Sequence, residues 1–461
     1  MTSGCKERRR RCSLSSDADA AASFDRGLLS PVAVGHDAVV SDDGVLAALV
    51  RAELGLVRAW SALGALPGET ADSIAEAWES LVIDVDSLAE SAVGGGNPVI
   101  PLVPLLKNAV PPEVRTWVHR GATSQDIVDT ALMLISRRAV DALVAVLTDV
   151  EDSLSAFAAE HRDVVSAGRT LAQHAVPTTV GYRAVGWLSG IRRASVRLRQ
   201  LTLPVQLGGA AGTRASFLEL GGPAAGELPE RYAEALGLDH TVAVWHTSRW
   251  PVTELADALA QTTDALGKLA ADVVTLSRTE IAEVSAGVGG ESSAMPHKSN
   301  PVAAVLIRSA ALRAPQLAAT LHLCAALAAD ERPAGAWHAE WPTLRELLRI
   351  ALGAATHAAQ LTATLSVDPH AVARNLALTR GLLVSERLSI VLTPLIGAER
   401  VAALVAAAGA GGDLAELIRD LPECAGLDIP DLLDPAAYTG DARAAVDRAT
   451  TPADGTEEER A

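Results

Sequence analysis

Residues 289–301 read GGESSAMPHKSNP and concentrate more chemically useful side chains than any other stretch of this 461-residue chain. Two hydroxyls, Ser292 and Ser293, lie in a segment bracketed by glycines and prolines, and a cation at Lys298 and an amide at Asn300 follow. Such a loop combines a proton-transfer group with groups that bind a carboxylate. This combination suits removal of a proton from the carbon next to a carboxylate.

Two long helices are predicted on either side of this loop. Apolar residues recur at helical spacing over 250–286 and again over 302–329. Pro296 and Pro301 prevent one helix from running through the segment, and its glycines allow strained backbone angles. For the loop composition alone, a surface turn rich in serine and proline is the alternative.

The string Ser-Ser-x-Met-Pro-x-Lys-x-Asn-Pro resembles the signature loop of the fumarase/aspartase superfamily. The resemblance implies that Ser292 is the catalytic base. It also implies that Lys298 and Asn300 help to hold a substrate carboxylate. The match covers ten residues and is highly specific.

The segment from 119 to 131, HRGATSQDIVDTA, resembles the first region shared by that superfamily. The resemblance implies that Thr123 and Ser124 bind a substrate carboxylate and that His119 and Gln125 line the site. Short hydroxyls ahead of an apolar periodic segment are also typical of a helix N-terminus, where free N–H groups and the positive dipole end favour an anion. Helix capping alone is the alternative for this stretch.

The segment from 167 to 178, AGRTLAQHAVPT, resembles the second shared region through Gly168, Thr170 and Gln173, of which Gln173 is implied to bind substrate. The histidine of this segment, His174, follows the glutamine rather than the threonine. This order resembles the 3-carboxy-cis,cis-muconate cycloisomerase branch. A histidine that titrates near neutral pH is a candidate catalytic acid, base or charge stabiliser, and a structural histidine is the alternative.

Three further strings favour the same branch: GGNPVIPLV at 95–103, GGAAGT at 208–213 and WHAEW at 337–341. The second string lacks the Lys-Ser/Thr pair of a phosphate-binding loop, so we expect a tight turn close to the active site. The two tryptophans of the third string are assigned to packing. Arg332 is a candidate for reaching substrate.

The chain departs from the cycloisomerase pattern beside several motifs. Arg120 and Arg214 add cations, Glu291 stands where glycine is usual, and Ser299 stands where arginine or glutamine is usual. Two interpretations stay open: the added cations are changes of the surface only, or they reshape the site for another succinate-like anion.

Three functions are therefore weighed. The first is a cycloisomerase-like enzyme that closes a lactone on a carboxymuconate by carboxylate addition and proton transfer. The alternative is a carbon–nitrogen lyase that releases fumarate from an N-substituted succinate of the nitrosuccinate, adenylosuccinate or aspartate type. A catalytically silent helical scaffold is the third, and the intact Ser292, Lys298 and Asn300 argue against it because buried polar groups without a function are costly.

Composition and periodicity predict an all-α fold, since 49% of residues are apolar, 3% are aromatic and long segments show a 3.6-residue repeat. We expect three helical domains: an N-terminal domain at 21–112, a central long-helix bundle with the signature loop at 113–365, and a C-terminal domain at 366–450. The arginine-rich segment 1–20 and the polar segment 451–461 are predicted to be disordered tails.

Five long segments are apolar on more than one side and need partners to bury the excess surface. They are 131–161, 178–201, 251–286, 302–329 and 337–365. The resemblance implies a homotetramer whose central bundle joins the subunits, with each active site shared among three of them.

The expected partner is a small di- or tricarboxylate substrate. A net charge of −17 argues against nucleic-acid binding by the folded part, since an acidic surface repels phosphates. Four cysteines without ligand spacing and scattered histidines predict no metal site and favour a reaction without a cofactor. With no signal peptide or membrane-spanning run recognised, we expect a cytoplasmic protein with no membrane partner.

Overall fold

The computed structural model describes residues 26–286, 290–291, 295 and 298–451. Helices dominate this part of the chain, and the strands within it form three two-stranded sheets. The all-α prediction is confirmed.

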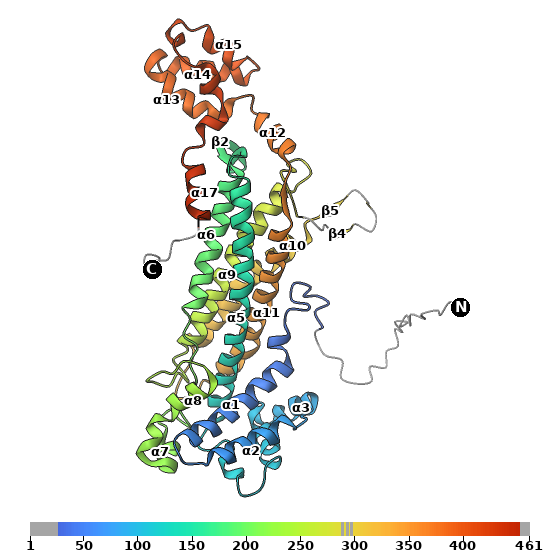
Figure 1. Ribbon diagram of the computed structural model, residues 1–461, viewed down its shortest axis with the longest axis vertical. Helices are drawn as coiled ribbons and strands as arrows, with labels where there is room; N and C mark the ends of the chain where they lie inside the picture. The colour runs from blue at the N-terminus through green and yellow to red at the C-terminus, as the bar shows by residue number, and fades with distance from the viewer. Residues whose placement is uncertain (1–25, 287–289, 292–294, 296–297, 452–461) are drawn as a thin grey trace, which may run out of the picture.

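Five long helices form a central bundle (Figure 1). They are α5 (Ser124–Glu160), α6 (Val180–Arg199), α9 (Trp250–Leu276), α10 (Val302–Ala326) and α11 (Ala336–Ala363). Helices α9 and α11 both pack on α10, while α5 packs on α6 and α11. Leucine, valine and alanine side chains at helical spacing fill the space between them, which is the burial that the periodicity predicted.

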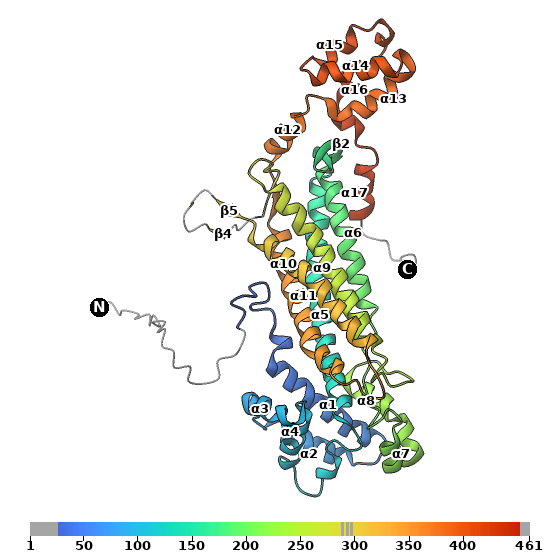
Figure 2. The same ribbon diagram turned by 180° about the vertical axis from the view of Figure 1, so that it is seen from behind.

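The N-terminal helices cover one end of the bundle together with α7 and α8 (Figures 1 and 2). Their bounds are α1 (Asp42–Ala62), α2 (Gly68–Glu79), α3 (Val85–Gly95), α4 (Val99–Asn108), α7 (Ala215–Gly221) and α8 (Leu228–Leu236). The hydroxyl of Ser41 caps α1 by accepting from Gly44 N at 3.1 Å. We call this the α1 end.

The opposite end carries the antiparallel hairpin of β1 (Val165–Thr170) and β2 (Gln173–Thr179), with the C-terminal helices beyond it (Figures 1 and 2). These are α12 (Pro369–Ala377), α13 (Ser385–Ile396), α14 (Ala398–Gly409), α15 (Leu414–Arg419) and α16 (Ile429–Leu433). The last helix, α17 (Ala442–Thr450), returns to pack on α6. We call this the hairpin end.

Short 3-10 helices connect these elements at Ala38–Val40, Arg115–Trp117, Gly222–Glu227, Leu382–Val384, Pro422–Cys424 and Pro435–Tyr438. One continuous core joins the N-terminal helices to the bundle, and a second core lies within 384–432. The boundaries proposed near 112 and 365 stay a prediction.

The predicted helix over 250–286 is too long. It ends at Leu276, and β3 (Val284–Ala286) pairs with β6 (Leu365–Val367) instead. Ala282 has φ +53°, and Glu283 N donates to the Leu276 carbonyl, so the chain turns back sharply there. A strand of only three residues is too short to interrupt helical periodicity, so the sequence did not reveal the boundary. The helix predicted from residue 178 likewise starts two residues late, because β2 runs to Thr179.

The signature loop leaves the side of the bundle through β4 (Gly290–Glu291) and returns through β5 (Ser299–Asn300), which pair with each other (Figure 1). Helix α10 follows it. Among the described residues, α10 is the one helix long and apolar enough to cross a membrane by length and composition. A bundle helix of a globular protein meets the same criterion, and α10 packs between α9 and α11.

Candidate active site

The three segments that resemble superfamily regions lie apart within one chain. His119, Thr123, Ser124 and Gln125 surround the first residues of α5 at the α1 end. Gln173 and His174 lie beyond the far end of α5, whose 37 residues span about 55 Å. Asn300 lies in β5 and Lys298 directly before it, and β5 projects from the side of the bundle (Figure 1). A single chain therefore assembles the first group only.

The start of α5 is held by the buried carboxylate of Asp126. It accepts from Thr123 N at 3.1 Å, from Gly208 N at 2.7 Å and from Gly209 N at 2.9 Å, and it contacts His246 Nε2 at 2.9 Å. Gly209 has φ +72°, and a Cβ on Gly208 would lie 2.7 Å from the His246 ring. The glycine-rich string therefore forms the expected tight turn beside the helix N-terminus.

Arg332 reaches this helix start from the loop between α10 and α11. Its Nη2 donates to Thr123 Oγ1 at 2.8 Å and to the Ala210 carbonyl at 3.1 Å, and its Nε donates to Gln125 Oε1 at 3.2 Å. Gln125 is buried and also donates from Nε2 to the His246 carbonyl at 2.9 Å. Both polar ends of Gln125 are thus occupied, and the exposed guanidinium of Arg332 brings a positive charge beside Thr123 and Ser124.

His119 has φ +58°, a left-handed backbone conformation that is unfavourable for a residue with a side chain. Its Nδ1 lies 2.7 Å from Oε1 of Glu53, a fully buried carboxylate on α1. Burial by itself lowers the pKa of His119, but the hydrogen bond to Glu53 and the charge of Glu53 outweigh burial, so the pKa is raised. This environment favours the imidazolium.

A buried ion cluster joins three bundle helices one turn into α5. The guanidinium of Arg249 donates to Asp129 at 2.7 and 3.0 Å and to Glu340 at 2.6 and 3.1 Å, and all three side chains are buried. Trp337 Nε1 donates to Asp129 Oδ1 at 2.9 Å. Burial opposes the charge of Arg249, but the two carboxylates outweigh it and raise its pKa. The cluster fixes α5 against α9 and α11 below the helix start.

The hairpin end has a different arrangement around its histidine. His174 pairs across the hairpin with Arg169, and the Arg169 guanidinium donates to both oxygens of buried Glu283, at 3.1 Å to Oε2. Arg183 lies 3.7 Å from Glu283 Oε2, and Asn375 Nδ2 donates to Oε1 at 2.9 Å. Burial and the Arg169 charge lower the pKa of His174. This environment favours neutral imidazole.

The turn of the hairpin is strained. Leu171 and Ala172 connect β1 to β2 with φ +49° and +65°, a two-residue connection that usually contains asparagine or glycine. The Leu171 side chain is 99% exposed, and Gln173 next to the turn is exposed as well. Gln173 is therefore exposed on its own chain, whereas His174 is half-buried.

In the signature loop, the side chain of Lys298 is exposed and its backbone N–H donates to the Met295 carbonyl at 3.0 Å. Asn300 is half-buried in β5. The predicted base, Ser292, lies outside the described residues, so its role stays a prediction. Among the residues that are described, no group of three or more His, Cys, Asp or Glu side chains could hold a metal ion.

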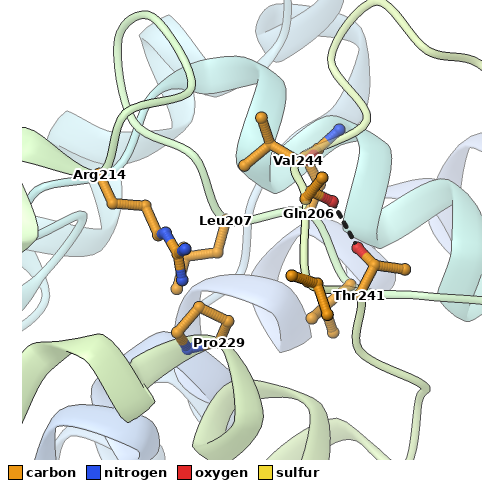
Figure 3. A pocket seen from close by; sticks show the side chains of 9 residues that line it. Gln206, Leu207, Arg214, Pro229, Thr241 and Val244 are labelled. Carbon is orange, nitrogen blue, oxygen red and sulfur yellow. Dashed lines mark hydrogen bonds between the residues drawn. The ribbon is translucent and has the colours of Figure 1, made fainter.

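A hollow near the α1 end is too small to be the substrate site. It lies between Arg214, Pro229 and Thr241 (Figure 3), and its volume of about 10 Å³ is that of a single water molecule. A larger hollow of about 320 Å³ lies between α13 and α14 in the C-terminal helices, away from all three motif segments. Neither hollow contains a residue predicted to bind substrate.

Four residues that support the site had no signal in the sequence: Glu53, His246, Arg249 and Glu283. The contact from Glu53 to His119 spans 66 positions, and that from Asp126 to His246 spans 120. No local pattern links positions so far apart.

A family profile described as lyase matches residues 43–315. Nitrosuccinate lyase of Streptomyces davaonensis is 47% identical over 93% of this chain and 95% of that protein. The 3-carboxy-cis,cis-muconate cycloisomerase of Pseudomonas aeruginosa is 40% identical over 89% of this chain and 93% of its own.

Solved structures agree with this fold. The 3-carboxy-cis,cis-muconate lactonizing enzyme from Pseudomonas putida superposes with a TM-score of 0.82 at 36% identity, covering 89% of this chain and 95% of that one. At such identity and coverage, both the fold and the family are shared.

Proposed function

This chain belongs to the fumarase/aspartase superfamily of lyases, and on that premise we propose that it eliminates the nitrogen substituent of an N-substituted succinate, converting nitrosuccinate to fumarate and nitrite. The observation that carries the proposal is its greater identity, over nearly the full length of both proteins, to a nitrosuccinate lyase than to a cycloisomerase. The carbon–nitrogen lyase is therefore placed ahead of the carboxymuconate cycloisomerase, which the sequence alone had favoured.

The chemistry needs a base, a stabilised intermediate and a leaving group. Ser292 takes a proton from the carbon next to one carboxylate, and the negative charge that develops on that carboxylate is stabilised by Lys298 and Asn300. The electron pair then forms the double bond, the carbon–nitrogen bond breaks, and its electron pair leaves with nitrite. A serine becomes a strong enough base only when nearby donors and a cation lower its pKa.

Cations at the α1 end support a dianionic substrate. The N-terminus of α5, the guanidinium of Arg332 at 2.8 Å from Thr123 and the raised pKa of His119 all favour a negative group beside Thr123 and Ser124. His174, whose pKa is lowered, suits a neutral hydrogen-bonding or proton-accepting role on the other side of the substrate.

The proposed site is completed by other copies of the chain. The first and second segments lie about 55 Å apart in one chain, so a shared site needs at least two subunits. Helix α10 leaves Val305, Leu312 and Leu323 50–73% exposed, an apolar face that a second copy would bury. We therefore keep a homotetramer with sites shared among three subunits as part of the proposal.

A carboxymuconate cycloisomerase is the second candidate, favoured by the fold match and by the His174 position after Gln173. There, carboxylate addition closes a lactone while Ser292 delivers a proton to the carbon next to a carboxylate. The same groups serve both reactions, which differ in the leaving or entering group.

Substrate tests separate the candidates. Purified protein is mixed with nitrosuccinate, adenylosuccinate, aspartate or 3-carboxy-cis,cis-muconate, while fumarate absorbance, nitrite release and loss of the conjugated diene are followed. Nitrite and fumarate in equal amounts support the proposal, and lactonisation without nitrite release overturns it in favour of the second candidate. No turnover of any substrate supports the silent scaffold.

Ser292→Ala tests the base. We expect turnover to fall by several orders of magnitude with unchanged helicity, since an activated nucleophile or base and its neighbours act as a unit. Ser285→Ala is the matched control, because this hydroxyl pairs with Ser366 at 2.9 Å in the β3–β6 sheet. Near-normal turnover of the Ser292 variant would reject its role.

A further inference from the structure

We propose that Glu53 is a positioning residue that keeps His119 as a fixed cation, with Nε2 left to donate to a negatively charged group of the substrate. The proposal rests on the proposed function, which places a dianionic substrate at the start of α5. It adds a residue from the N-terminal helices that no motif contains.

The contact between Glu53 and His119 fixes the orientation of the imidazole ring. Oε1 of Glu53 lies 2.7 Å from Nδ1 of His119, so Nδ1 carries the proton of this hydrogen bond. Nε2 is then the nitrogen left for substrate. Because a buried carboxylate fixes one ring nitrogen, the orientation of the other is set as well.

Glu53 is an unusual residue for its place. It lies on α1 among core residues, is fully buried, and its second oxygen has no hydrogen-bond partner among the described residues. A buried carboxylate with a free oxygen is costly unless a nearby cation compensates it. His119 is the cation in direct contact, so each charge makes the other tolerable.

The backbone conformation of His119 also supports a functional role for its side chain. His119 keeps φ +58° although glycine would adopt that conformation without strain, and Gly121, two residues on, also has a positive φ of +81°. Strain retained at a residue with a side chain indicates that the side chain is needed there. The strained turn leads directly to Thr123 and the anion-favouring start of α5.

Other charged groups around the ring act on the pKa of His119 in both directions. Asp126 on α5 adds to the effect of Glu53 in raising the pKa of His119, while Lys107 on α4 opposes it. Tyr232 on α8 is fully buried near both carboxylates, and burial raises its pKa, so it stays neutral. The carboxylates therefore outweigh the one nearby lysine.

Glu53→Gln tests the role because the amide oxygen still accepts from Nδ1–H while the charge is lost. Neutral His119 would then present an unprotonated Nε2 to the substrate. We expect kcat/KM near neutral pH to fall on the order of 10- to 100-fold, the factor for loss of one charged hydrogen bond, mainly through KM. The basic limb of the pH profile should move to lower pH.

A cycle with His119→Gln separates this role from a structural one. The double variant should be no worse than His119→Gln alone, because Glu53 acts only through the histidine. Asp257→Asn is the matched control, since it removes a His–carboxylate contact of 2.8 Å at an exposed place, with His322. An unchanged pH limb in Glu53→Gln, or additive losses in the double variant, would overturn the proposal.

A substrate-free measurement distinguishes failure of this proposal from failure of the proposed function. The proton NMR titration of His119, assigned by its loss in His119→Gln, should show a pKa above the ordinary value in the wild type and a lower pKa in Glu53→Gln. If this shift appears while nitrosuccinate is not turned over, the proposed function fails and the pair stands. If His119 titrates at or below its ordinary value in the wild type, the pair fails whatever the substrate.

Discussion

Each end of the bundle has a buried glutamate near a histidine predicted to lie in the site, but the contacts of that glutamate differ between the two ends. At the α1 end, Glu53 contacts His119 itself and the pKa of the histidine is raised. At the hairpin end, Glu283 is engaged by Arg169 and Arg183, and His174 lies opposite an arginine, with a lowered pKa.

This difference moves the pKa values of the two histidines in opposite directions, upward at His119 and downward at His174. Pairs of titratable groups whose environments push their pKa values apart are the usual sign of separate acid and base roles. Because the two histidines lie at opposite ends of α5, they can act on the same substrate only where different subunits bring opposite ends together. The electrostatics and the proposed shared site thus support each other.

The largest expected effect comes from mixing subunits. His119→Gln and His174→Gln should each lose about 100-fold or more of turnover, the contribution typical of an acid–base or charge-stabilising group. Co-expression of the two should restore part of the activity, because some sites then combine intact ends from different chains. Turnover per assembled oligomer is the measurement.

The matched control for mixing uses two variants of the same end. His119→Gln with Thr123→Ala should show no recovery, because every α1 end in the mixture is damaged. If the mixture of opposite-end variants stays as inactive as its parents although hetero-oligomers form, the two histidines do not share a site.

The second effect compares stability at the two ends. Glu283→Gln leaves Arg169 and Arg183 without their buried counter-charge, and arginine cannot shed its proton, so we expect a loss of about 3–5 kcal/mol in the free energy of unfolding. Glu53→Gln should cost less, because His119 can become neutral. Chemical unfolding at equal protein concentration measures both, and equal losses would contradict the contrast.

The sequence predicted the long helices and much of the grouping of site residues, but not the contacts between residues far apart in the chain. The long helices, the tight turn at 208–213 and the grouping of His119, Thr123 and Gln125 follow from periodicity and adjacent positions in the chain. Arg332 was anticipated as a candidate, and the structure adds its contact with Thr123.

What the sequence could not predict depends on long-range contacts. The pKa of His119 is lowered by burial and raised more strongly by Glu53, and the pKa of His174 is lowered by burial and by Arg169; Glu53 belongs to no motif. The end of α9 at Leu276 was missed because a strand of three residues is too short to interrupt the apolar spacing of a helix. The separation of the segments also needs the length and direction of α5, which no single motif contains.

A third effect is that the two ends respond to pH in opposite directions. The raised pKa of His119 gives stability that is fully present below its ordinary value of 6.5 and is lost as pH rises through the folded value. Hydrogen bonds from Arg169 and Asn375 outweigh burial and lower the pKa of Glu283, so its stability is present above the ordinary value of 4.5 and is lost as pH falls through the folded value.

Hydrogen exchange across pH tests this contrast. After correction for the intrinsic pH dependence of amide exchange, the free energy of local opening should fall in mild base around 115–123 and in acid in the hairpin, each by on the order of 1.4 kcal/mol per unit of pKa shift. Glu53→Gln should abolish the basic-side response alone. The same pH response at both ends, or persistence of the basic-side response in that variant, would contradict the assignment.

The smallest effect concerns backbone strain, which both ends contain. Ala172 has φ +65° in the hairpin turn, so Ala172→Gly should relieve a cost of about 1–2 kcal/mol while adding about 0.5–1 kcal/mol of lost chain entropy. We expect a net gain of up to about 1.5 kcal/mol with turnover unchanged, measured by chemical unfolding. Ala175→Gly, in the extended strand β2, is the matched control and should lose stability.

At the α1 end, His119→Gly relieves similar strain at φ +58° but removes the imidazole, so we expect turnover to be lost. Equal tolerance of glycine at both positions would mean that the strain at His119 has no connection with catalysis.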